Sequence, residues 1–164
     1  MDVTTNNTKS KVNIRLLVGT GMLSGLAFVL QYLEFPIPIM PFFIRFDFSD
    51  LPALIGAFAY GPLAGVIVEF IKNLLHCTVT QSFTVGELSN FILGAVFTGT
   101  AGLIYKKNKT KKGAIIGAIV GSVIMGIISF PSNLFIVYPA YEKFTPINEI
   151  MDAYSKLLPS AGKI

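Results

Sequence analysis

The sequence predicts an all-α membrane protein in which apolar helices cross the bilayer several times. Of its 164 residues, 52% are hydrophobic and 13% are charged, and the mean hydropathy is +0.66. Soluble domains carry about 25% charged residues, so this composition is too apolar for a globule that faces water. The length suffices for about five or six helices of roughly 20 residues each.

Five apolar segments are expected to form the helices of one membrane domain. The first begins after a polar N-terminus and holds one charge, Arg15, near its start. The second is entered through Ser49 or Asp50 as the N-cap, with Pro52 in its first turn. A Gly61-Pro62 turn separates it from the third. The five expected spans are 12–33, 50–60, 62–75, 85–105 and 113–137.

Prolines shape the segments between and within these spans. Three prolines in residues 34–43 forbid a regular helix, so this stretch is expected to be an apolar extended loop. Pro131 is expected to bend the fifth helix. Apolar residues recur at helical spacing in residues 146–158 and predict a short amphipathic helix on the outer side. No long apolar segment follows Pro159.

Basic residues indicate which helix ends face the cytoplasm. Of the thirteen Lys and Arg residues, three lie in residues 9–15 and five in the loop 106–112. The positive-inside rule places both segments in the cytoplasm. The N-terminus is therefore predicted to be cytoplasmic and the C-terminus of this chain to lie outside. The lysine cluster is interpreted as this topology signal, and no nucleic-acid binding is expected.

The few polar side chains within the spans are the candidates for ligand binding, because a buried amide or charge needs a partner. Lys72 and Asn73 end the third span, one turn after Glu69. One alternative is a Glu69–Lys72 pair that snorkels to the outer interface; the other is that Lys72 and Asn73 line a polar cavity. Asn90 and Asn133 lie deeper in the fourth and fifth spans. Asn133 could contact a ligand or satisfy the helix where proline interrupts it.

The sequence holds no recognisable catalytic or metal-binding set. Cys77 has no second cysteine to pair with, and no metal-ligand spacing is present. No Walker motif is present either, so this chain is not expected to be an ATPase. We predict that the protein is not an enzyme. A membrane-embedded hydrolase that uses Glu69, His76 or Glu87 remains an alternative, as does a purely structural bundle.

Two rows of glycines have the spacing that lets helices approach closely. Gly21 and Gly25 form the first row, and Gly113, Gly117 and Gly121 form the second. Small residues four apart allow close helix contact in membranes. Each row can either pack inside the bundle or dock a partner membrane protein.

Four motifs along the chain are characteristic when they occur together. They are FDFSDLPAL at 46–54, GPLAG at 61–65, KNLL at 72–75 and GELSNF at 86–91. This set resembles the substrate-binding S components of energy-coupling factor (ECF) vitamin transporters, and the riboflavin type most of all. The similarity covers about residues 14–158.

The resemblance implies a six-helix membrane bundle that binds riboflavin as a transported ligand, not as a cofactor. It implies association with a transmembrane coupling subunit and two cytoplasmic ATPase subunits, and transport by toppling of the S component. Gly21 and Gly25 are the candidates for docking the coupling subunit.

The resemblance also implies where the vitamin binds. Residues 34–43 correspond to a loop that caps it in the outer half of the bundle, and Asn133 matches an amide of the riboflavin site. Aromatic and apolar side chains suit a flat flavin ring. The ligand-binding candidates are Phe35, Ile39, Phe42, Phe43, Lys72, Asn73, Asn90 and Asn133.

The chain departs from the family pattern at its end. The family's sixth helix carries a further Asn and a Lys that help to bind the flavin, and nothing after Pro159 matches it. Two alternatives therefore accompany the riboflavin hypothesis. The chain can be an S component for another vitamin or small molecule, or a truncated form that does not bind.

Overall fold

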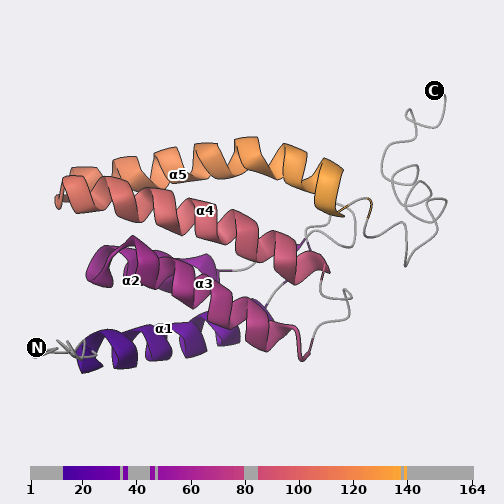
Figure 1. Ribbon diagram of the computed structural model, residues 1–164, viewed down its shortest axis with the longest axis horizontal. Coiled ribbons are helices and arrows are strands. Elements are labelled where there is room, and N and C mark those ends of the chain that lie inside the picture. The colour runs from indigo at the N-terminus through magenta and orange to yellow at the C-terminus, as the bar shows by residue number, and fades with distance from the viewer. Residues whose placement is uncertain are drawn as a thin grey trace, which may run out of the picture.

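Apolar helices make up nearly all of the chain that the structure describes. In the computed structural model, the described residues are 13–33, 35–36, 45–46, 48–79, 85–137 and 139. Figure 1 shows the helices in chain order. They are α1 (Ile14–Tyr32), α2 (Asp50–Tyr60), α3 (Pro62–His76), α4 (Val85–Lys107) and α5 (Lys111–Ser132), which continues into a π-helical turn, η1 (Asn133–Val137).

The all-α class is thus confirmed for the described residues, with one small addition. Two strands of two residues each, β1 (Phe35–Pro36) and β2 (Arg45–Phe46), form an antiparallel pair in the connection between α1 and α2. The sequence predicted an extended segment there but not this pairing. The expected amphipathic helix at 146–158 lies outside the described residues.

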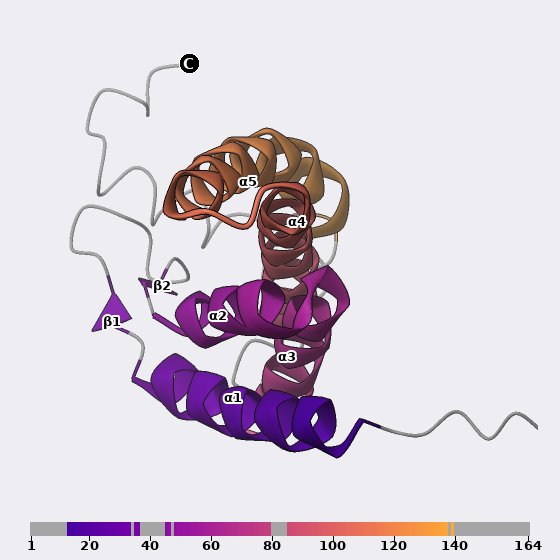
Figure 2. The same ribbon diagram turned by 90° about the vertical axis from the view of Figure 1, so that its left-hand side faces the viewer.

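Helix α3 lies at the centre of the bundle. It packs against α1, α2 and α4, while α5 packs against α4. The two views show α1 and α5 at opposite edges of the bundle (Figures 1 and 2). Polar side chains on different faces of α3 can therefore reach different neighbouring helices.

The distribution of side chains suits a lipid environment. Helices α1, α4 and α5 include segments long and apolar enough to cross a membrane. Large apolar side chains cover the outside, with Phe130 76% and Ile127 67% exposed. The centre is built from small residues such as Ala27 and Ala53 and from polar ones. Lipid stabilises the apolar exterior, so the polar groups are enclosed where they can pair.

Local sequence explains the ends of the helices. The side chains of Asn13 and Thr110 cap α1 and α5 by accepting hydrogen bonds from backbone N–H groups. Gly61 joins α2 to α3 with φ +106°, a backbone conformation that favours glycine, and Pro62 opens α3. Ser49 occupies the N-cap position of α2 but makes no capping hydrogen bond with its side chain.

Proline alters the end of α5 as its chemistry requires. Pro131 has no N–H and crowds the carbonyl one turn earlier, so one hydrogen bond is missing near the end of α5. The chain continues as η1, and the N–H of Asn133 bonds to the carbonyl oxygens of Ser129 and Phe130. π-helical turns are rare and occur mostly as single turns of this kind.

The two glycine rows have different surroundings. A Cβ atom at Gly117 would lie 2.8 Å from the carbonyl oxygen of Ala101, and one at Gly121 would lie 2.9 Å from that of Phe97. This row therefore lets α5 approach α4 closely. At Gly21 and Gly25 a Cβ atom would meet nothing within 4 Å.

Replacing Gly117 by Leu should destabilise the bundle by about 1–3 kcal/mol, because a side chain there collides with the backbone of α4. Gly126→Leu on the same helix is the matched control, since a Cβ atom at Gly126 meets nothing within 4 Å. Thermal unfolding in detergent, followed by circular dichroism, measures the difference. Equal melting temperatures for the two variants would contradict close α4–α5 packing at Gly117.

Candidate functional site

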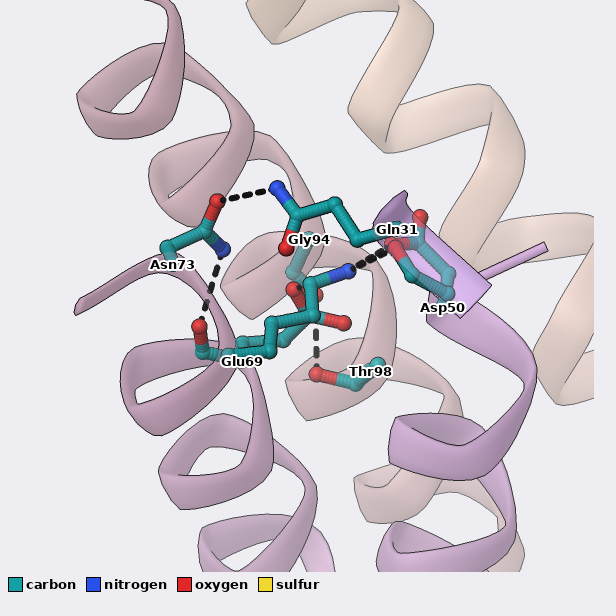
Figure 3. A network of polar contacts seen from close by, with 8 residues as sticks. Gln31, Asp50, Glu69, Asn73, Gly94 and Thr98 are labelled. Atoms are coloured by element: carbon teal, nitrogen blue, oxygen red, sulfur yellow. Dashed lines mark hydrogen bonds and ion pairs between the residues drawn. The ribbon is translucent and has the colours of Figure 1, made fainter. Parts of the chain in front are cut away.

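A network of buried polar side chains links α3 to α1 and α2 and packs against α4 (Figure 3). Its centre is Lys72, whose side chain is fully buried. The Lys72 ammonium donates hydrogen bonds to Ser49 Oγ at 2.7 Å and to Asp50 Oδ1 at 2.5 Å. Its Nζ also lies 2.9 Å from Glu69 Oε2 in an ion pair. The three N–H donors of the ammonium group thus each have an acceptor nearby.

Glu69 is enclosed at the interface of α3 with α4. Its side chain is fully buried one turn before Lys72, as the i, i+3 spacing allows. A Cβ atom at Gly94 of α4 would lie only 2.6 Å from the carboxyl carbon of Glu69, so glycine at this position leaves room for the carboxylate. Neither carboxylate oxygen of Glu69 makes a hydrogen bond of good geometry with a described residue, although Oε2 lies in the ion pair with Lys72. One ammonium therefore faces two carboxylates, those of Glu69 and Asp50.

Asn73 extends the network to α1. Its Nδ2 donates to the carbonyl oxygen of Glu69 at 2.8 Å, and its Oδ1 accepts from Gln31 Nε2 at 3.2 Å. Figure 3 shows the Gln31 and Asn73 amides pointing toward each other. Both residues are 3% exposed. Two consecutive residues of α3 thus bond to two different helices.

A second polar pair joins the end of α3 to the start of α4. His76 Nδ1 and Glu87 Oε1 lie 3.0 Å apart, and both side chains are largely buried. Burial and the nearby Glu87 carboxylate raise the pKa of the Cys77 thiol above its ordinary value. The pair fixes the two ends of the connection between α3 and α4.

The structure brings some of the predicted site residues together and leaves others apart. Lys72 and Asn73 belong to the buried network. Asn90 is half-buried in α4, and Asn133 is half-buried with its Nδ2 donating to Ser129 Oγ at 3.3 Å. The backbone of Phe35 lies in β1. Ile39, Phe42 and Phe43 lie outside the described residues.

Sequence reasoning missed several partners in this network. One of the two alternatives for Lys72 was a Glu69–Lys72 pair that snorkels to the interface, whereas the pair is fully enclosed. Gln31 and the pairing of Asp50 with Lys72 were not foreseen. Gln31 was detectable as an amide in the last turn of an apolar segment. No periodic signal links Asp50 to a residue 22 positions away.

Comparison with known proteins decides the family. The family model described as "ECF transporter, substrate-specific component" matches residues 15–161. The chain belongs to this family. The resemblance drawn from the four sequence motifs is therefore confirmed.

Relatives of this S component include two named riboflavin transporters. It is 40% identical to riboflavin transporter RibU of Staphylococcus aureus over 138 residues, which are 82% of this chain and 73% of the relative. It is 37% identical to riboflavin transporter FmnP of Bacillus subtilis over 154 residues, or 92% and 81% of the two chains. Both relatives are named as transporters.

A solved structure of the S component of a bacterial ECF transporter has a closely similar fold. The TM-score is 0.74 at 40% sequence identity, over 79% of this chain and 77% of that one. Together with the long apolar helices, family membership makes this S component a multi-pass membrane protein.

Replacing Lys72 by Met should destabilise this S component strongly, because it leaves two carboxylates without their cation. Breaking a buried ion pair by removing one partner costs about 3–5 kcal/mol. The double variant Lys72→Met/Glu69→Gln should recover part of this loss, since it removes one of the two orphaned charges. Thermal unfolding of the single and double variants in detergent measures both effects. Wild-type stability in Lys72→Met would contradict the geometry of the network.

Proposed function

We propose that this S component is the high-affinity riboflavin-binding subunit of an ECF-type importer. The observation that carries the proposal is the similarity to two riboflavin transporters, at 40% and 37% identity over 82% and 92% of the chain. The subunit presents the vitamin to a transmembrane coupling subunit, which works with two cytoplasmic ATPases. The N-terminus and the basic loop 106–112 face the cytoplasm, and the C-terminus of this chain lies on the outer side.

The proposed vitamin site lies in the outer half of the bundle. A flavin ring needs apolar and aromatic walls with a few polar anchors. The side chains of Phe35, Ile39, Phe42 and Phe43 provide the walls, and the amides of Asn90 and Asn133 provide the anchors. Lys72 and Asn73 complete the set of candidates. Lys72 and Asn73 are 0% and 3% exposed. They therefore act on the site indirectly, by holding the buried polar network in place.

Riboflavin binding is tested directly with protein purified in detergent. Quenching of flavin fluorescence should give a dissociation constant below micromolar. A thermal-shift screen of other vitamins tests the alternative ligands, because a ligand at a thousandfold excess over its dissociation constant stabilises by about 4 kcal/mol. The measurement is made on this chain and on a version to which a sixth apolar helix has been added. Absence of riboflavin binding in both, with stabilisation by a different vitamin, would reject riboflavin as the ligand.

Asn133→Ala should weaken riboflavin binding about 5- to 150-fold, because a lost hydrogen bond leaves a buried flavin polar group unpaired. Ser129→Ala is the matched control, since Ser129 Oγ is the partner of the Asn133 amide. It removes that hydrogen bond but keeps the amide, so binding should stay close to wild type. An unchanged affinity in Asn133→Ala would show that this amide serves only the helix after Pro131.

Gly21→Leu/Gly25→Leu should abolish riboflavin uptake by cells while sparing riboflavin binding. A Cβ atom at either position meets nothing within 4 Å, which supports a surface open to a partner helix. The coupling subunit should then no longer co-purify. Gly126→Leu, also in open space but on α5, is the control and should keep uptake. Loss of riboflavin binding in the α1 double variant would contradict a docking role for these glycines.

A further inference from the structure

The connection between α1 and α2 is fastened to α3 at both of its ends. Gln31, in the last turn of α1, bonds to Asn73 at 3.2 Å. Ser49 and Asp50, where α2 begins, bond to Lys72 at 2.7 and 2.5 Å. Consecutive residues on a helix point about 100° apart. Adjacent residues of α3 can therefore hold two neighbouring helices at once.

Pairing of β1 with β2 closes the same connection between its two ends. Phe35 is paired with Phe46, and Pro36 with Arg45. In the part of this connection that the structure describes, side-chain hydrogen bonds hold both ends on α3. The backbone pairing of β1 with β2 lies between these ends.

Neither Lys72 nor Asn73 is placed to touch a ligand directly. Lys72 is fully buried, and Asn73 is 3% exposed. The Lys72 ammonium already has Ser49, Asp50 and Glu69 around it. Asn73 Oδ1 accepts a hydrogen bond from Gln31, and Asn73 Nδ2 donates one to the carbonyl oxygen of Glu69. A ligand would have to break these bonds to reach either group.

We propose that Lys72 and Asn73 are positioning residues, which fix the two ends of the α1–α2 connection on α3 and so set the geometry of the vitamin site. The inference rests on the proposed riboflavin-binding function and assigns these residues a role within it. A buried ion pair adds little net stability compared with apolar packing but can specify register. Here the ammonium is satisfied only when the start of α2 lies at the observed position along α3.

A double-mutant cycle between Gln31 and Asn73 separates positioning from direct contact. Gln31→Ala and Asn73→Ala should each weaken riboflavin binding about 3- to 10-fold, because each removes the one hydrogen bond between these side chains that joins α1 to α3. The other bond of Asn73, to the Glu69 carbonyl oxygen, lies within α3. The double variant should bind no more weakly than the weaker single variant, because both remove the same link. If Asn73 instead touched the vitamin, Asn73→Ala would weaken binding further in the Gln31→Ala background, and that result would overturn the proposal.

Ser24→Ala is the matched control for these variants. Ser24 also lies on α1 and is 2% exposed, but its hydroxyl bonds within the helix to the carbonyl oxygen of Thr20. It should lower the melting temperature as a buried polar substitution does and leave the riboflavin affinity unchanged. If the riboflavin affinity fell as much in Ser24→Ala as in Gln31→Ala and Asn73→Ala, the loss would reflect lower stability in general. That result would overturn the positioning role of Lys72 and Asn73.

Hydrogen–deuterium exchange without ligand tests whether α3 holds the two ends of the α1–α2 connection, independently of riboflavin. Gln31→Ala and Ser49→Ala should raise exchange in β1, β2 and the first turn of α2, and leave α5 unchanged. Unchanged exchange, or raised exchange with unchanged riboflavin affinity, would overturn the positioning role. If wild-type protein bound no riboflavin, the proposed function would fail, while the exchange data would still decide whether α3 holds the connection.

Discussion

The buried ammonium group of Lys72 organises the arrangement of the first three helices. It lies between acceptors from the start of α2 and a carboxylate of α3 itself. A charge enclosed among apolar helices is tolerated only with its partners in place, so the position of α2 along α3 is tightly constrained. Asn73, the next residue, extends the same constraint to α1 through Gln31. These bonds hold the last turn of α1 and the first residues of α2 on α3.

Small residues make this polar centre possible. Gly94 leaves space for the Glu69 carboxylate beside α4, and Gly117 and Gly121 allow α5 to approach α4. The outer surface, by contrast, is covered with large apolar side chains. Apolar side chains gain nothing by leaving lipid, so close packing and internal hydrogen bonds must hold such a bundle together.

The two glycine rows illustrate how one sequence pattern can have two structural meanings. Four-residue spacing occurs in both, yet Gly117 touches the backbone of α4 and Gly21 faces open space. The row at Gly113, Gly117 and Gly121 serves the fold of the single chain. The row at Gly21 and Gly25 has the open space that the proposed docking of a partner helix requires.

Sequence alone determined the membrane class, the helical segments and the family, because hydrophobicity, proline and glycine act locally and the four motifs are contiguous. It also singled out Lys72, Asn73 and Glu69 as unusual, since polar groups are rare in apolar spans. Only the tertiary structure decided their partners. Ser49, Asp50 and Gln31 are 23, 22 and 42 positions away from the residues they bond, and no local pattern encodes such pairing. It depends on how α1, α2 and α4 pack around α3, which also decided that Lys72 is enclosed and does not snorkel to the interface.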